Sequence, residues 1–188
     1  MTAQKLVLGL TGMPGSGKSL AVKVAKERGY DIVVMGDVVR EEAEKRRLEP
    51  NPENIGKIML ELRQTEGSNV IAKRCIPKIK STERQRVIVD GIRSLNEVEE
   101  FKKNFPTFSL VAIHASPDTR FTRLYRRRRS DDAGDWKVFH ERDMRELSVG
   151  LGNAIAMAEY IVVNEEPVEV VRERIKKVLG KVERKWMK

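Results

Sequence analysis

The stretch KLVLGLTGMPGSGKSLAVKVAKERG, residues 5–29, decides the fold of this chain. An apolar, strand-like run passes through a glycine-rich turn into a helix-like segment. The turn, GMPGSGKS at residues 12–19, matches the pattern G-x-x-x-x-G-K-[ST] in the strand–turn–helix context that the pattern requires. Glycines permit backbone angles at which successive N–H groups point at phosphate oxygens, and the start of a helix adds partial positive charge. The segment therefore predicts a phosphate-binding loop, or P-loop.

The predicted P-loop supplies the cofactor site. Lys18 is expected to reach the β- and γ-phosphates of ATP and to take part in catalysis, and Ser19 is expected to bind Mg²⁺. The predicted cofactors are therefore ATP and Mg²⁺. The residues expected to bind them are Gly12, Met13, Pro14, Gly15, Ser16, Gly17, Lys18 and Ser19.

The composition indicates one globular domain without a membrane anchor. The 188 residues are 40% hydrophobic and 35% charged, and the longest apolar runs are far shorter than the roughly 20 residues that cross a bilayer. No leader-like segment precedes the first strand, and Cys75, the single cysteine, can form no internal disulfide, so we expect a cytoplasmic protein. The net charge of +9 favours anionic partners such as nucleotides, coenzymes or nucleic acid, although a Lys- and Glu-rich surface of the thermophile kind has the same effect.

Five short apolar runs predict the strands of the fold. Each is almost continuously apolar, as is typical of strands buried on both faces of a parallel sheet, and helix-length segments lie between them. This alternation predicts an α/β P-loop NTPase fold, with a five-stranded parallel sheet sandwiched by helices. The predicted strands are residues 6–10, 31–35, 87–89, 110–113 and 160–163.

The predicted domain, residues 1–188, has a core and two attachments. The long helical stretch between the second and third strands predicts a helical insertion at about 38–80 that binds an acceptor substrate. An arginine-rich lid is predicted at about 119–147. The core is then 1–37, 86–118 and 148–188, and it closes with an amphipathic helix whose apolar face is expected to hold Val168, Val171, Ile175 and Val178.

Two further motifs follow predicted strands and are expected at the sheet edge that carries the P-loop. In VIVDGIR, residues 87–93, Asp90 is placed like a Walker-B carboxylate that orients Mg²⁺ and serves catalysis, with a strand-ending turn residue as the alternative. In VMGDVVR, residues 34–40, Asp37 is a candidate for catalysis and substrate binding, or else the N-cap of the next helix.

An arginine cluster follows the fourth strand. Six arginines lie within residues 120–129, and Arg120, Arg123 and Arg127 recur at helical spacing on one face. Planar guanidinium groups stabilise the charge of a phosphoryl group in transfer. SDDAGD, residues 130–135, is expected to form a flexible turn, and residues 136–147 a second helix that brings further arginines. The alternative is a solvated basic helix face.

The motifs together resemble two kinase families. GMPGSGKS, MGDVVR, IGKIMLELRQTEG and VDGIRS are similar to segments of adenylate kinases, whereas SPDTRFTRLYRRR and AEYIVVNEEPVEVVRERI are similar to dephospho-CoA kinases. Overall the chain resembles archaeal adenylate-kinase-related proteins of the dephospho-CoA-kinase-like group. The resemblance implies catalytic roles for Arg123 and Arg127. It departs from adenylate kinases where Ile92 stands alone before Arg93, and where Glu97 lies near the position of the glutamine that reads adenine.

These features predict an ATP- and Mg²⁺-dependent kinase. The leading acceptor is a small phosphate-bearing molecule, above all a nucleoside monophosphate, whose phosphate Arg40 and Arg93 would hold beside Asp37. One alternative is a dephospho-CoA kinase, in which Asp37 would be the base for a ribose hydroxyl. A second, less favoured because stacking aromatics are few, is a nucleic-acid- or ribosome-associated ATPase. The sequence carries no signal of the oligomeric state.

Overall fold

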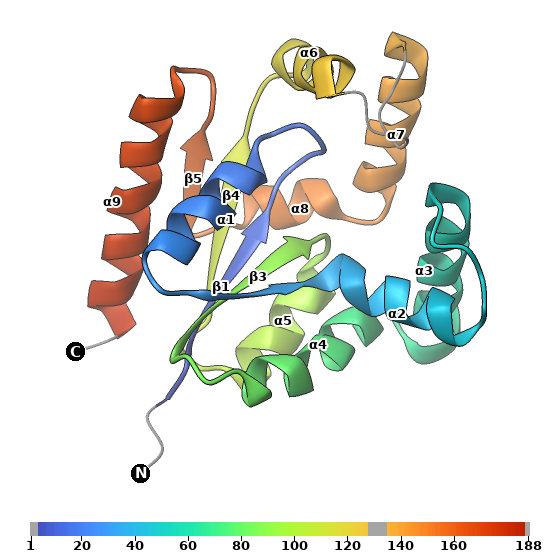
Figure 1. The fold of residues 1–188 in the computed structure, drawn as a ribbon, viewed down its shortest axis with the longest axis horizontal. Coiled ribbons are helices and arrows are strands. Elements are labelled where there is room, and N and C mark those ends of the chain that lie inside the picture. Colours follow the sequence, from blue (N-terminus) through green and yellow to red (C-terminus); the bar gives the residue numbers. More distant parts are fainter. Residues whose placement is uncertain (1–3, 128–134, 187–188) are drawn as a thin grey trace.

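The computed structural model describes residues 4–127 and 135–186 as an α/β sandwich (Figure 1). Five parallel strands form one sheet in the order β2-β3-β1-β4-β5. The predicted fold class is therefore confirmed. The strands are β1 Leu6–Thr11, β2 Asp31–Val34, β3 Arg86–Ile92, β4 Ser109–His114 and β5 Tyr160–Val163.

Helices cover both faces of the sheet. In the described part of the chain they are α1 Lys18–Glu27, α2 Met35–Lys45, α3 Pro52–Glu66, α4 Val70–Ser81, α5 Leu95–Asn104, α6 Pro117–Arg127, α7 Trp136–Ser148, α8 Leu151–Ala156 and α9 Val168–Trp186. Figure 1 shows α1 and α9 on one face and α4 and α5 on the other. None of these helices is long and apolar enough to cross a membrane.

The alternation of side chains along the central strand creates two hydrophobic cores. Leu6, Leu8 and Leu10 of β1 pack with residues of α1 and α9, whereas Val7 faces the core that includes α4 and α5. Successive strand residues point to opposite faces, so a strand covered by helices on both sides is apolar throughout. All six residues of β1 are buried. The apolar run that predicted this strand is thus explained by burial on both faces.

The helices after β2 share the core of the sheet. Val38 of α2 and Ile79 of α4 belong to the same buried cluster as Val87 of β3. Residues 38–80, predicted as a helical insertion, are helical in α2, α3 and α4. The assignment of this region to acceptor binding remains a proposal.

The boundary between β2 and α2 differs from the prediction. Met35 was expected to end the strand, but it begins α2, where its side chain is buried, and the N-cap is Val34. Asp37 consequently lies in the first turn of the helix, so the N-cap alternative was wrong. A carboxylate in the first turn still favours the helix, because it faces the positive end of the helix dipole.

The apolar face of α9 also differs from the prediction. Val168 is 58% exposed, because it is the first residue of the helix, and Val178 is only partly buried. Val171 and Ile175 are buried as expected, and the stripe continues through Leu179 and Val182.

Glu183 fastens α9 to the first helix and the sheet. Its carboxylate accepts hydrogen bonds from Arg28 at 3.2 and 2.5 Å and from the Tyr30 hydroxyl at 3.1 Å, and Arg86 of β3 lies 3.5 Å away. Burial opposes the ionised form of Glu183, but the hydrogen bonds and the charges of the two arginines outweigh it and lower the pKa. Burial raises the pKa of Tyr30, which therefore stays a donor.

Replacing Glu183 by Gln should lower the free energy of unfolding near neutral pH by about 1.5–3 kcal/mol, because charged hydrogen bonds are lost. A carboxyl whose pKa is depressed on folding stabilises the protein above its ordinary pKa and loses this effect as the pH falls through the depressed value. The difference from the unmodified protein should therefore vanish in acid. Urea unfolding across this pH range measures it. Glu173→Gln, at an exposed position of α9, is the matched control, and equal effects of the two changes would refute the prediction.

Candidate functional site

The P-loop joins β1 to α1 at the carboxyl edge of the sheet. Gly12 and Gly17 have φ values of 148° and 91°. A Cβ at Gly12 would lie 2.3 Å from the Ile113 carbonyl oxygen, and one at Gly17 would lie 2.1 Å from Nδ2 of Asn164. Neither position can accept a side chain without displacing β4 or the segment after β5. Glycine is therefore required here both by backbone conformation and by space.

Lys18 is the first residue of α1 and folds back over the loop. Its Nζ donates a hydrogen bond to the Gly12 carbonyl at 2.6 Å. Burial lowers the pKa of Lys18 to about 8; the nearby carboxylates of Asp90 and Glu146 oppose this shift, and the guanidinium of Arg93 adds to it. A partly desolvated cation at this position attracts an anion more strongly than a solvated one does.

Asp90 lies beside the P-loop at the carboxyl end of β3, in register with Leu10 of β1. Its Oδ1 atom is buried and has no hydrogen-bond partner among the described residues. Burial raises the pKa of Asp90, although the charges of Lys18 and Arg93 act in the opposite direction. An unpartnered buried acceptor next to a phosphate-binding loop is suited to orient a metal-bound water.

The site fits Mg²⁺ better than a metal held entirely by protein. Among residues 4–127 and 135–186, no three or more His, Cys, Asp or Glu side chains are placed to hold a metal. Mg²⁺ usually keeps several waters and uses one or two protein ligands together with substrate phosphates. Ser19, exposed on α1, and Asp90 are the residues that would hold it.

The predicted acceptor residues lie on two elements. Asp37 and Arg40 form an ion pair on α2, 2.5 Å between Oδ1 and Nη1, with both side chains about half exposed. Arg93 follows β3, and its Nη1 lies 3.1 Å from Glu146 Oε1 of α7. The pKa of Asp90 is raised by the charge of Asp37 and lowered by that of Arg93, in addition to the effects of burial and Lys18. The structure thus places these four charged groups close enough to interact electrostatically.

Glu97 has a structural role next to Arg93. It is fully buried, and its carboxylate accepts hydrogen bonds from Arg63 Nη2 at 2.6 Å and from the Arg93 backbone N–H at 2.8 Å. Glu97 lies near the position where adenylate kinases place the adenine-reading glutamine. Because both its oxygens already accept hydrogen bonds, the carboxylate is not available to read a base.

Arg120, which shares a helical face with Arg123, is buried in contacts with α7 and the P-loop. Only 4% of it is exposed, and it donates to Asp143 of α7 at 2.9 and 2.5 Å and to the Pro14 carbonyl at 3.1 Å. It also lies 4.9 Å from the centre of the Phe139 ring. Helical spacing placed Arg120 beside Arg123, but its partner Asp143 is supplied by another helix. Arg120 therefore joins α6 to α7 and to the P-loop.

Arg123, one turn further along α6, also contacts the P-loop. Its Nη2 donates to the Asn164 carbonyl at 2.9 Å and its Nη1 to the Ser16 carbonyl at 3.5 Å, while Asn164 Nδ2 donates to Ser16 O at 2.8 Å. Arg127 is the last residue of α6. Arg128 and Arg129, together with residues 130–134 of the predicted turn, lie outside the described residues.

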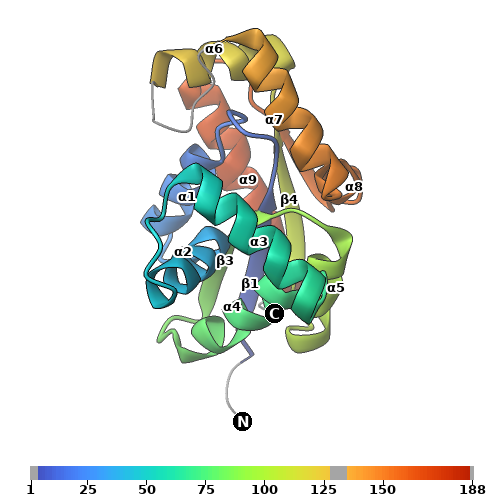
Figure 2. The same cartoon turned by 90° about the vertical axis from the view of Figure 1, so that its right-hand side faces the viewer.

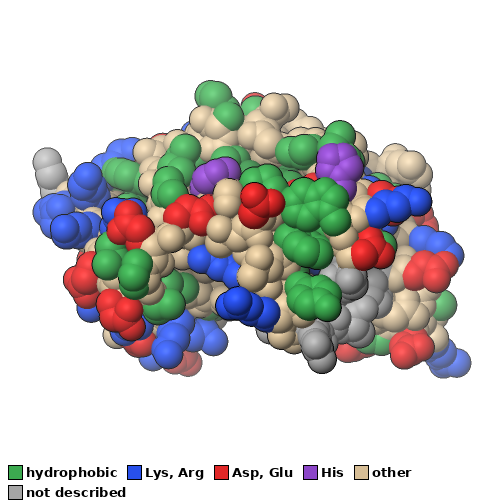
Figure 3. Space-filling model, turned by 90° about the horizontal axis from the view of Figure 1, so that it is seen from above, with side chains coloured by type: hydrophobic (Ala, Val, Ile, Leu, Met, Phe, Trp, Pro, Cys, Tyr) green, Lys and Arg blue, Asp and Glu red, His purple; other side chains and the backbone are tan. Residues whose placement is uncertain are grey.

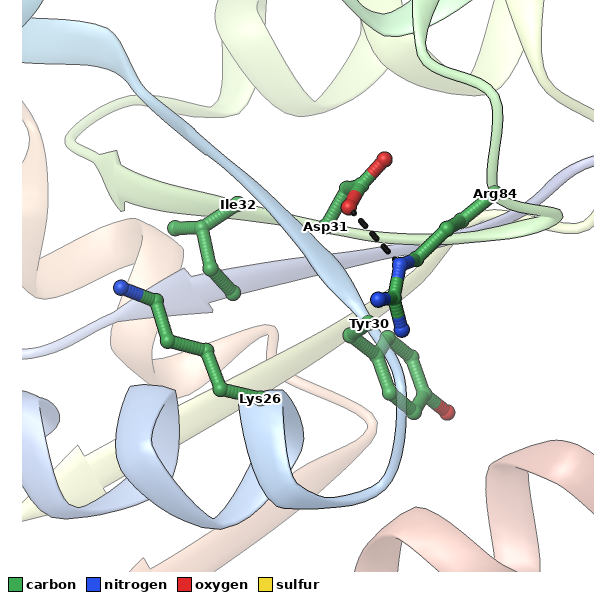
Figure 4. A pocket seen from close by; sticks show the side chains of 5 residues that line it. All are labelled: Lys26, Tyr30, Asp31, Ile32 and Arg84. Atoms are coloured by element: carbon green, nitrogen blue, oxygen red, sulfur yellow. Dashed lines mark ion pairs between the residues drawn. The ribbon is translucent and has the colours of Figure 1, made fainter.

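The sequence analysis missed Glu146 and Asp143, the two carboxylates of α7 that pair with arginines of other elements. No spacing pattern could have identified them, because their partners come from distant parts of the chain. The predicted helix over 136–147 is confirmed as α7. A separate hollow of 380 Å³, lined by Lys26, Tyr30, Asp31, Ile32 and Arg84, lies at the amino end of β2, away from these residues (Figure 4).

Solved structures share this fold. A protein described as TT1252 from Thermus thermophilus is similar with a TM-score of 0.63 and 14% identity, covering 95% of this chain and 98% of that one. Shikimate kinase from Bacteroides thetaiotaomicron is similar with a TM-score of 0.59 and 17% identity, covering 93% and 98%. At these identities the likeness establishes the fold alone.

Sequence relatives are much closer. Residues 11–140 match the family described as AAA domain. A UPF0200 protein of Hyperthermus butylicus is 46% identical over 180 residues, 96% of each chain. One of Methanocaldococcus jannaschii is 48% identical over 179 residues, 94% of this chain and 90% of that one. With this identity over nearly its whole length, the chain belongs to the UPF0200 protein family and contains an AAA domain.

Proposed function

We propose that the protein is an ATP- and Mg²⁺-dependent kinase that transfers a phosphoryl group to a small phosphate-bearing acceptor, with a nucleoside monophosphate as the leading candidate. The observation that carries the proposal is that Lys18, Asp90 and Arg93 lie together at the carboxyl edge of the sheet, where Asp90 and Arg93 influence the pKa of Lys18, and Lys18 and Arg93 influence that of Asp90. A kinase needs a donor-phosphate site, a metal-orienting carboxylate and an acceptor-side cation within reach of one another.

On the donor side, the backbone of residues 12–17 cradles phosphate and Lys18 neutralises it. When bound beside Ser19 and Asp90, Mg²⁺ would supply positive charge that offsets the negative charge of the phosphates. Ser19 would bind the metal, and Asp90 would orient its water shell through Oδ1, which has no hydrogen-bond partner among the residues that the structure describes. Arg123 and Arg127 of α6 are proposed to neutralise charge during transfer. As a lid, α6 and α7 would also exclude water from the phosphates.

On the acceptor side, Arg93 and Arg40 would bind the phosphate of the acceptor. Arg93 Nη1 pairs with Glu146, and a guanidinium carries five N–H donors, so Arg93 can keep this pair and also donate to a phosphate. Arg40 is about half exposed and linked to Asp37. A phosphate acceptor is already largely ionised near neutral pH, since its second pKa is about 6. The proposed reaction therefore needs no general base.

A second candidate is a kinase that acts on a hydroxyl, such as the ribose hydroxyl of dephospho-CoA. The position of Asp37 supports it, because this half-exposed carboxylate lies near enough to Asp90 to raise its pKa. A hydroxyl must lose its proton during transfer, and Asp37 would accept it. The solved relatives described as shikimate kinases include one in complex with shikimate, so the fold accommodates acceptors other than nucleotides.

Binding of nucleic acid by the arginine-rich helix α6 is not favoured. Arg120 is buried in an ion pair, and Arg123 donates to two backbone carbonyls. Figure 3 shows the side of the molecule that carries α6 and α7, where the described acidic and basic side chains are interspersed with hydrophobic ones. A polyanion is better bound by a continuous basic surface.

The proposed function can be tested by measuring ADP release from ATP with a panel of nucleoside monophosphates, dephospho-CoA and RNA as acceptors. We expect one of the monophosphates to give the fastest release. Fastest release with dephospho-CoA would favour the hydroxyl kinase. Stimulation by RNA alone, falling steeply as salt rises, would favour the nucleic-acid-associated ATPase.

Removing the Lys18 amine should abolish ATP turnover and remove a pH dependence of ATP binding. Because the pKa of Lys18 is about 8, the free protein carries the full charge below this pH. Above it, binding must be accompanied by proton uptake, so affinity should fall by up to about tenfold per pH unit. Calorimetry from pH 7 to 9.5 measures this. Lys18→Ala should bind weakly with little pH dependence, and a steep dependence that persists in this variant would contradict the assignment.

Replacing Arg93 by Ala should raise the KM of the acceptor about ten- to a hundredfold, because one charged phosphate contact is lost. The KM of ATP should change little. Steady-state kinetics with the best acceptor of the panel measures both. Arg74→Ala is a suitable control, since Arg74 lies on α4 and pairs with Glu42 and Glu66. If ATP binding suffers and acceptor binding does not, the two sites have been reversed.

Replacing Asp37 by Asn distinguishes the two kinase candidates. With a phosphate acceptor, appreciable kcat should remain, because no proton has to leave. The side chain keeps its size and one oxygen that can accept from Arg40. With a hydroxyl acceptor, loss of the base should lower kcat by about 10²–10⁴-fold. A thousandfold decrease with unchanged KM and Tm would establish the hydroxyl kinase as the better assignment.

A further inference from the structure

Three parts of the molecule meet at Arg93. Its backbone follows β3 of the core. Its Nη1 lies 3.1 Å from Oε1 of Glu146 on α7 and 3.6 Å from Sδ of Met59 on α3. Figure 2 shows α3 and α7 on the same side of the molecule, facing the viewer. The guanidinium proposed to hold the acceptor is thus contacted by a helix of the predicted insertion and a helix of the predicted lid.

Only one of the two oxygens of the buried Glu146 carboxylate has a partner among the described residues. Its side chain is 12% exposed, one oxygen pairs with Arg93, and Oε2 is buried with no hydrogen-bond partner among the described residues. Removing a carboxylate from water is unfavourable unless its hydrogen bonds are replaced. An ion pair formed for stability alone would be expected to satisfy both oxygens, as Asp143 does with Arg120. The incomplete pairing of Glu146 points to a role in the site.

A second glutamate holds the backbone of Arg93. Glu97 accepts a hydrogen bond from the Arg93 backbone N–H at 2.8 Å and is itself fixed by Arg63 at 2.6 Å. Glu97 therefore restrains the backbone of Arg93, and Glu146 restrains its side chain. Arg93 has a long flexible side chain, and holding it in one orientation before substrate arrives reduces the entropy lost on binding.

We infer that Glu146 is a positioning residue of the acceptor site. It acts through Arg93, whose guanidinium it holds near the P-loop, and it couples α7 to acceptor binding. This inference rests on the proposed function for the part that concerns the acceptor. It differs from a purely structural role in one respect: loss of Glu146 should be felt chiefly at Arg93, with only a smaller effect of its charge on Lys18.

A double-mutant cycle tests the inference by steady-state kinetics with ATP and the nucleoside monophosphate that gives the fastest ADP release. Glu146→Ala should raise the KM of the monophosphate about tenfold and change the KM of ATP much less, and Glu146→Gln should recover part of this loss. In the Arg93→Ala background, Glu146→Ala should have no further effect. Additive effects of the two changes, or an equal rise in the KM of ATP, would overturn the inference. Glu141→Ala, at an exposed position of α7, is the matched control.

A measurement without substrate separates this inference from the proposed function. ¹⁵N NMR of the ligand-free protein reports how freely the Arg93 guanidinium rotates, with Arg93→Lys used to assign the signal. Rotation should be restricted in the unmodified protein and in Glu141→Ala, and faster in Glu146→Ala at unchanged Tm. Unchanged rotation in Glu146→Ala would overturn the inference. Faster rotation, combined with no turnover of any monophosphate, would support the positioning of Arg93 and refute the proposed acceptor.

Discussion

The candidate site depends on one constraint, the parallel direction of all five strands. Parallel strands end at the same edge of the sheet, so groups from distant parts of the chain converge there. β1 lies between β3 and β4, which places the P-loop beside Asp90 and Arg93. The Thr11 hydroxyl reinforces this edge by donating to the Ile92 carbonyl at 2.8 Å in a buried position. Reversing any of these strands would move its functional residues to the opposite edge.

Desolvation is the second property that organises the site. Burial lowers the pKa of Lys18 and raises that of Asp90, so both groups are held where their charged forms lack full hydration. Such an arrangement reduces the stability of the ligand-free protein but strengthens electrostatic interactions with a phosphate. The unpartnered oxygens of Asp90 and Glu146 lie in this same region.

The ion pairs of α7 illustrate two uses of a buried carboxylate. Asp143 satisfies the Arg120 guanidinium through two hydrogen bonds, and Arg120 also donates to the P-loop carbonyl of Pro14. This network is closed and fixes the positions of α6, α7 and the loop. Glu146, one turn further along α7, pairs with Arg93 through Oε1, whereas its Oε2 has no hydrogen-bond partner in the described part of the chain. Helix α7 thus carries Asp143, which joins it to α6, and Glu146, which contacts Arg93 on the proposed acceptor side.

The sequence by itself determined the fold class, the P-loop and the five strands, because these features are encoded by short, local patterns. The tertiary structure decided the roles of the charged residues. Helical spacing could place Arg120 beside Arg123, but only packing revealed that Arg120 is buried against Asp143, 23 residues away. Likewise, Glu97 and Glu146 acquire their roles from Arg63 and Arg93, which the fold brings to them. The strength of a charge interaction depends on the distance between the groups and on their burial, and the spacing of residues along the chain predicts neither.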